Sequence, residues 1–224
     1  MSYAVKEIFY TLQGEGGNAG RAAVFCRFTG CNLWSGREVD REKAVCQFCD
    51  TDFVGTDGIG GGKFSTASEL AQAIAASWSS GVPGSIPGLL TGQARPLVVC
   101  TGGEPLLQLD EPLLAELHHL GFEVAVETNG TVAPDIGAQR IDWLCVSPKA
   151  GSQLVLTSGD ELKLVFPQSG AAPEQFVQLP FRHFFLQPMD GLSQQANTAA
   201  AVDYCLRNPQ WRLSLQTHKL LGIP

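Results

Sequence analysis

The sequence lacks any apolar run of the length that a membrane-spanning helix needs, about 18 residues. Its N-terminus, Met-Ser-Tyr-Ala-Val-Lys-Glu, also lacks the apolar stretch of a secretory signal peptide. Positive charge is scarce, because 15 Lys and Arg stand against 22 Asp and Glu, which gives a net charge of −7. We therefore expect a cytoplasmic protein with no membrane contact and no broad nucleic-acid surface.

The chain also lacks the even number of cysteines that a disulfide framework would use. It has 7 cysteines, and a cytoplasmic compartment keeps thiols reduced. Metal binding and burial are therefore the two roles to weigh. Cys100, Cys145 and Cys205 fall among apolar neighbours on expected strands or helices, so we assign them to the core.

Three other cysteines lie close together in the sequence. Cys46 and Cys49 form a C-x-x-C pair, and a charged segment poor in apolar residues separates them from Cys31. Such a segment is typical of a loop, and three converging thiolates select zinc or an iron–sulfur cluster. No fourth Cys or His follows nearby, whereas a closed zinc site has four protein ligands. Cys26 is the alternative fourth ligand, although its place beside Phe25 on an expected strand favours burial.

Expected strands alternate with polar loops and helices, which predicts an α/β fold with a parallel sheet. The expected helices are too few for a closed eight-fold barrel, which needs about 250 residues. We therefore predict one domain over residues 1–224, an abridged, open TIM-like barrel of about six parallel strands. Within it we expect a cluster loop at 29–54 and a Gly- and Pro-rich surface insertion at 81–96. The expected strands are 5–10, 22–28, 97–100, 122–126, 142–146, 161–166, 184–186 and 211–215, and the expected helices begin at 66, 110, 173 and 195.

Polar motifs follow several of these strands directly. In a parallel sheet the carboxyl ends of the strands share one rim, where such folds place their active sites. Gly102 and Gly103 would let a ligand approach the backbone closely, and Glu104 could accept a hydrogen bond from an ammonium group. Each motif taken alone could equally be an ordinary turn. The motifs are Thr101-Gly-Gly-Glu-Pro105, Glu127-Thr-Asn-Gly130, Ser147-Pro-Lys149, Gln187-Pro-Met-Asp190 and Gln216-Thr-His-Lys219.

The cysteine triplet together with Gly-Gly-Glu-Pro resembles the radical S-adenosylmethionine superfamily. There, three cysteines hold a 4Fe–4S cluster, and the amino and carboxylate groups of S-adenosylmethionine chelate the fourth iron. Reductive cleavage of that cofactor yields a 5′-deoxyadenosyl radical that abstracts a hydrogen atom. The usual spacing is C-x3-C-x2-C, whereas this chain has C-x14-C-x2-C.

The longer spacing resembles one branch, the 7-carboxy-7-deazaguanine synthases of the queuosine (7-deazapurine) pathway. The similarity covers most of the chain outside residues 81–96. The motifs that carry it include Phe9-Tyr-Thr-Leu-Gln-Gly-Glu15, Phe25-Cys-Arg-Phe28, Gly30-Cys-Asn-Leu-Trp-Ser-Gly36, Phe48-Cys-Asp-Thr-Asp-Phe53, Thr101-Gly-Gly-Glu-Pro-Leu-Leu-Gln108 and Val126-Glu-Thr-Asn129.

The resemblance implies a homodimeric lyase with a 4Fe–4S cluster, S-adenosylmethionine and Mg²⁺ as cofactors. It would contract the ring of 6-carboxy-5,6,7,8-tetrahydropterin to 7-carboxy-7-deazaguanine and release ammonia. A flavodoxin- or ferredoxin-type protein would supply electrons. No catalytic residue beyond the cluster and the cofactor is assigned.

The resemblance also implies which residues bind each group. Cys31, Cys46 and Cys49 would hold the cluster, and Thr51 would bind Mg²⁺. S-adenosylmethionine would contact Phe48, Cys49, Asp50, Gly103, Glu104, Ser147, Pro148, Lys149, Gln187, Pro188, Met189 and Asp190. The substrate would contact Leu12, Gln13, Gly14, Glu15, Arg27, Thr101, His218 and the terminal carboxylate of Pro224.

The residue types suit such a substrate, which carries a carboxylate and a pterin edge. Arg27 shares a face with Ala23 and Phe25 on an apolar strand and can hold a carboxylate bidentately, although a buried ion pair is the alternative. A threonine hydroxyl with substrate oxygens is compatible with Mg²⁺, which keeps most of its water. Strand-like alternation predicts that Asp50 and Asp52 point away from the metal.

Two other functions stay open at this point. One is a different radical S-adenosylmethionine enzyme, such as an activator of a glycyl-radical protein. The other is a zinc-stabilised binding module without catalysis.

Overall fold

The computed structural model describes residues 2–81 and 95–224, and most of the expected insertion at 81–96 lies outside these residues. A nine-stranded sheet forms the centre, in the order β3-β1-β2-β4-β5-β6-β7-β8-β9. The strands are β1 (Tyr3–Leu12), β2 (Ala22–Phe28), β3 (Gly62–Phe64), β4 (Leu97–Gly102), β5 (Glu123–Thr128), β6 (Trp143–Val146), β7 (Gly159–Phe166), β8 (Phe181–Pro188) and β9 (Trp211–Leu213).

The sheet is mostly parallel and does not close. Strands β2 and β4 to β9 run parallel, whereas β1 runs antiparallel to both β2 and β3. The predicted α/β fold with an open parallel sheet and few helices is confirmed; seven strands run parallel, where we expected about six. Strand β3 was missed because it is short and follows a glycine-rich segment that is typical of turns.

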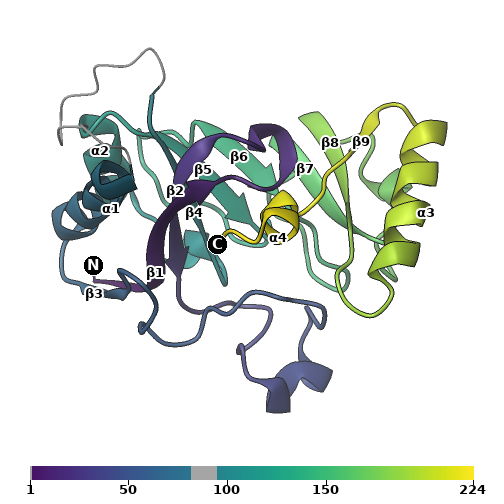
Figure 1. The fold of residues 1–224 in the computed structure, drawn as a ribbon, viewed down its shortest axis with the longest axis horizontal. Helices are drawn as coiled ribbons and strands as arrows, with labels where there is room; N and C mark the ends of the chain where they lie inside the picture. Colours follow the sequence, from purple (N-terminus) through teal and green to yellow (C-terminus); the bar gives the residue numbers. More distant parts are fainter. Residues whose placement is uncertain (1, 82–94) are drawn as a thin grey trace.

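Helices α1 (Ala67–Gly81) and α2 (Glu111–His119) lie at one end of the molecule and α3 (Gln194–Arg207) at the other (Figure 1). Helices α1 and α2 pack beside each other near β1, β2 and β5, and α3 packs on β8 and β9. A capping box starts α1, because Glu69 N–H donates to Thr66 Oγ1 at 3.1 Å and Glu69 Oε2 accepts from Thr66 N–H at 3.3 Å. The remaining elements are η1 (Gly16–Asn18), η2 (Glu38–Lys43), η3 (Pro105–Leu107), η4 (Pro173–Gln175) and α4 (Thr217–Leu221).

Strand alternation decides which side chains face the helices. On β2, Val24, Cys26 and Phe28 belong to the main core beneath α1 and α2. Arg27 and Phe25 therefore lie on the opposite face, called here the inner face, as their alternation predicts. Cys26 is fully buried in that core, so it cannot join the cysteine loop as a fourth ligand. Among the described residues, no helix is long and apolar enough to span a membrane.

The connection between β1 and β2 folds across the inner face. Gln13 Nε2 donates to Glu127 Oε1 on β5 at 2.7 Å, and Gly17 N–H donates to Glu161 Oε2 on β7 at 2.8 Å. This path differs from the expected shared rim, because β1 is antiparallel and its end pairs with the start of β2. Residues 12–15 therefore reach the site across the inner face of the sheet, and not from the rim that the parallel strands share.

Candidate active site

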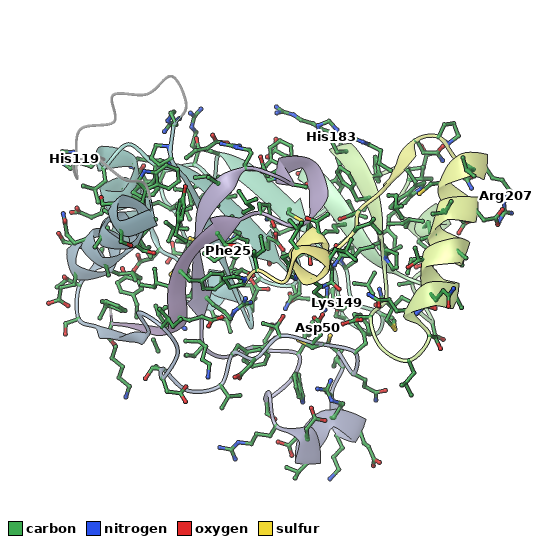
Figure 2. All side chains as sticks on the ribbon, viewed as in Figure 1. Phe25, Asp50, His119, Lys149, His183 and Arg207 are labelled. Carbon is green, nitrogen blue, oxygen red and sulfur yellow. The ribbon has the colours of Figure 1, made fainter. Side chains whose placement is uncertain are left out.

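A pocket of about 340 Å³ lies on the inner face near the carboxyl ends of the parallel strands. This volume is in the range that small-molecule sites use. In Figure 2, three of its lining residues, Phe25, Asp50 and Lys149, lie around α4. The predicted site residues in its lining are Leu12, Gln13, Gly14, Glu15, Arg27, Cys46, Phe48, Cys49, Asp50, Thr51, Thr101, Gly103, Ser147, Lys149, Gln187, Pro188, Met189, Asp190, His218 and Pro224. The predicted site residues outside the lining are Cys31, Glu104 and Pro148.

Glu104 lies beneath the pocket wall rather than in the open crevice where we expected it. Its side chain is fully buried. Its carboxylate accepts hydrogen bonds from Leu106 N–H at 3.0 Å, Thr128 Oγ1 at 2.7 Å and Asn129 N–H at 2.8 Å. Burial raises the pKa of Glu104, and the hydrogen bonds, which lower it, offset only part of this effect. Glu104 therefore ties the end of β4 to the end of β5, and its three donors come from within the chain.

The paired glycines allow the close approach of two chain segments. Gly102 has φ +138°, and a Cβ there would lie 2.2 Å from the Phe28 carbonyl oxygen. A Cβ on Gly103 would lie 2.0 Å from the carbonyl oxygen of Gly30. The expected reason was the approach of a ligand, but the structure shows that the backbone leading into Cys31 fills this space. The glycines thereby bring the cysteine loop against the tip of β4.

The three thiols differ in protonation. A hydrogen bond between Cys46 and Cys49 lowers the pKa of Cys49 to about 6 and raises the pKa of Cys46. Burial raises the pKa of Cys31, which also senses the charge of Cys49. Across residues 2–81 and 95–224, no three His, Cys, Asp or Glu side chains are grouped as ligands of one metal ion.

Arg27 lines the pocket and also forms the ion pair that was the alternative to substrate binding. Its Nε donates to Glu7 Oε1 at 2.7 Å. Neither Nη atom of Arg27 has a hydrogen-bond partner in the described part of the chain. Strand pairing places Arg27 beside Thr101. The guanidinium is therefore held at one edge while its other edge is free for an anion.

A buried lysine that sequence reasoning missed lies deeper in the pocket. Lys163 on β7 is 4% exposed, and its Nζ donates to Glu15 Oε2 at 2.5 Å and to Glu127 Oε2 at 2.9 Å. Burial alone would lower the pKa of Lys163, but Glu127 and Glu15 raise it well above its usual value. Against the opposing effect of burial, Lys163 lowers the pKa of Glu15 to about 2. The signal was available, because Lys163 alternates with the apolar Leu162 and Leu164 on an expected strand.

The C-terminal segment crosses the mouth of the pocket. Thr217 N–H donates to the Gly14 carbonyl at 3.0 Å, and Thr11 Oγ1 donates to the Pro224 carbonyl at 3.0 Å. Lys219 Nζ donates to Asp50 Oδ2 at 2.7 Å and to Asp190 Oδ2 at 2.6 Å. Thus α4 links the cysteine loop to the end of β8.

The two acids beside Thr51 point in different directions. Asp52 forms an ion pair with Lys6 at 3.1 Å and is largely exposed. Asp50 turns toward α4, and both acids line the pocket. Asp50 is held toward α4 by Lys219, whereas Asp52 is held by Lys6.

The fold and the site define an α/β enzyme whose small-molecule pocket joins a cysteine loop to buried charged side chains. No protein-family model matches the chain. The chain is 63% identical to the 7-carboxy-7-deazaguanine synthase of Caulobacter vibrioides over 224 residues, with 100% of both chains covered. The enzyme of that name from Bacteroides thetaiotaomicron is 39% identical over 223 residues, again with 100% of both covered. The crystal structure of QueE from Escherichia coli matches with a TM-score of 0.67 and 26% identity, covering 96% of this chain and 94% of that one.

These relatives show that the chain belongs to the 7-carboxy-7-deazaguanine synthase family, which consists of enzymes of the lyase type.

Proposed function

We propose that this protein contracts the ring of 6-carboxy-5,6,7,8-tetrahydropterin to 7-carboxy-7-deazaguanine and releases ammonia, in queuosine biosynthesis. One observation carries the proposal. A single pocket joins the thiols of Cys46 and Cys49 to Arg27 and to the buried charges around Lys163. A cofactor at the cysteine loop and a charged small substrate on the inner face would therefore share one pocket.

The thiols suit a 4Fe–4S cluster as its protein ligands. Cys46 and Cys49 line the pocket, and Cys31 is close enough to sense the charge of Cys49. In a 4Fe–4S cluster each of the three thiolates would bind a different iron. Cys26 lies in the core on the other face of the sheet. The donor set is therefore three soft sulfurs with one position left for a cofactor.

S-adenosylmethionine would occupy the rim beside these thiols, against the residues that follow β6 and β8. Lys149 is held there by its own turn, because its Nζ donates to the Ser147 carbonyl at 2.7 Å and to Ser147 Oγ at 2.6 Å. Pro148 lies behind this turn and accepts a hydrogen bond from Gln168 Nε2 at 3.3 Å. When bound, the cluster and S-adenosylmethionine would supply the radical that starts the reaction.

The inner-face side chains match the two ends of the pterin. The free edge of Arg27 would bind the substrate carboxylate. Gln13 and Glu127, which already hydrogen-bond to each other, present an amide and a carboxylate to the donors and acceptors of the pterin edge. Thr51 would add a hydroxyl to a Mg²⁺ ion bound mainly by substrate oxygens and water. Helix α4 and Pro224 cover the mouth and would limit the entry of water.

The remaining parts of the proposal concern assembly. We propose a single-domain chain that forms a homodimer and receives electrons from a flavodoxin- or ferredoxin-type protein. Their support is the resemblance of the motifs to the family and the position of the cysteine loop at the edge of the molecule (Figure 1).

Anaerobic reconstitution followed by a product assay tests the proposal. Reconstituted protein should be brown and should convert the carboxytetrahydropterin to the deazapurine with one ammonia released per product, given S-adenosylmethionine and a reductant. Cleavage of S-adenosylmethionine without the deazapurine would show that the substrate is wrong. A colourless protein with stoichiometric zinc would exclude the cluster.

A further inference from the structure

The charged segment between Cys31 and Cys46 folds back on itself. It forms η2, which extends away from the body of the molecule (Figure 1). The Leu33 carbonyl accepts from Val45 N–H at 3.0 Å and from Cys46 N–H at 3.4 Å. The insert therefore begins and ends side by side, and its length does not separate the first thiol from the pair.

One cation of this insert reaches back to the C-x-x-C turn. Arg41 Nη1 donates to the Gln47 carbonyl at 2.8 Å and to the Cys49 carbonyl at 3.1 Å. Its Nε donates to Glu38 Oε2 at 2.7 Å and its Nη2 to Glu38 Oε1 at 2.5 Å. The guanidinium is therefore fixed on one edge by a carboxylate and on the other by two carbonyls of the turn.

Arg41 also stacks on the ring of Trp34, which is itself fixed in place. Its guanidinium carbon lies 4.0 Å from the centre of the Trp34 ring. Trp34 is 7% exposed, donates from Nε1 to the Arg37 carbonyl at 3.2 Å, and meets the buried ring of Phe53 edge-on at 5.6 Å. A planar cation stacked on a buried ring loses little freedom when it forms its hydrogen bonds.

Side-chain contacts also hold the turn at Gln47, whose Nε2 donates to the Glu42 carbonyl at 2.9 Å, and at Asp50, which accepts from Lys219 Nζ at 2.7 Å. In the described part of the chain, no backbone group of residues 47–53 pairs with another backbone group. Side chains therefore hold this stretch, and Arg41 supplies two of the hydrogen bonds to it from the side of the insert.

We propose that Arg41 is a positioning residue that holds the C-x-x-C turn in the shape in which Cys46 and Cys49 present their sulfurs to the cluster. This inference rests on the proposed function, since it concerns the ligands of the proposed cluster. It gives the insert a physical role: the insert carries a cation to the outer side of the turn while the thiols face the pocket. Arg41 itself contacts neither the pocket nor the sulfurs.

Release of iron from the reconstituted protein tests this role. Wild type, Arg41→Ala and Arg41→Lys are loaded anaerobically, and the loss of visible absorbance is followed in an excess of an iron chelator. Arg37→Ala is the matched control, because Arg37 is exposed in the same insert and its side chain has no partner within the described residues. We expect Arg41→Ala to lose iron about tenfold faster, as two hydrogen bonds from a charged donor disappear. Arg41→Lys should release iron at a rate between those of the wild type and Arg41→Ala. An ammonium group can restore one of the two hydrogen bonds to the turn but does not stack on Trp34.

The thermal midpoint of the metal-free protein separates positioning from folding. We expect it to be the same for all four proteins, because Arg41 lies outside the core. Equal iron release by wild type and both Arg41 variants would overturn the inference, and so would equally fast release by Arg37→Ala. Failure of the wild type to take up iron would instead overturn the proposed function and the inference together.

Discussion

Replacement of Lys163 by methionine would leave two carboxylates in the pocket without their cation. Lys163 is 4% exposed and contacts Glu15 and Glu127. Removing one partner of a buried ion pair costs about 3–5 kcal/mol. Because both carboxylates border the pocket, we expect the lower value, about 3 kcal/mol. For a chain of this size that lowers the melting temperature by roughly 6–12 °C.

The loss should depend on pH in a defined direction. In the wild type, the lowered pKa of Glu15, about 2, gives stability that is present above the unfolded pKa of roughly 4.5 and lost as the pH falls toward 2. In Lys163→Met, burial without the cation raises the pKa of Glu15, so this group takes up a proton in the folded state. The deficit relative to wild type should therefore shrink between pH 7 and pH 5.

Thermal unfolding of the metal-free protein, followed by circular dichroism at both pH values, measures this effect. Lys63→Met is the matched control, because Lys63 is exposed on the edge strand β3. A second replacement, Glu127→Gln in the Lys163→Met protein, should recover part of the loss by removing one uncompensated charge. The reasoning would be refuted if Lys163→Met were no less stable than Lys63→Met at pH 7, or if its deficit grew on acidification.

Three further variants test the pocket. Arg27→Ala should raise the KM for the pterin roughly 10- to 100-fold by removing a charge-assisted contact, with the iron content unchanged; loss of iron would show that Arg27 is structural. Thr51→Ala should weaken the dependence of turnover on Mg²⁺ in a metal titration, and an unaltered titration would refute its role as a ligand. Lys219→Met should raise the KM roughly fivefold by releasing α4 from two partly exposed carboxylates, and an unchanged KM would show that α4 closes the pocket without this link.

Local patterns were enough to predict much of the sheet and one side of the site. Alternation along β2 placed Arg27 on the inner face, opposite Cys26. The motifs after β6 and β8 reach the pocket because parallel strands share a rim. These predictions succeed because each depends only on strand periodicity and on the direction of neighbouring strands.

The features that were missed depend on contacts between distant segments. Two hydrogen-bond partners of Glu104, Thr128 and Asn129, lie at the end of a neighbouring strand. No local pattern shows whether its carboxylate points into the pocket or binds groups of the protein interior. The network of Lys163 needs the hairpin that carries Glu15 across the sheet, and the antiparallel direction of β1 sets that path. The direction of Asp50 follows from Lys219, which is far from it in sequence. Short elements such as α4 also carry too few residues for a periodic signal.

The central claim is that one pocket holds a cluster at its thiols and a pterin at its inner face. A crystal structure of the reconstituted protein with S-adenosylmethionine and the carboxytetrahydropterin, recorded with anomalous scattering at the iron edge, tests this most directly. We predict iron beside Cys31, Cys46 and Cys49, the cofactor on the rim, and the pterin carboxylate on Arg27. Iron absent from these thiols, or a pterin bound outside this pocket, would contradict the claim.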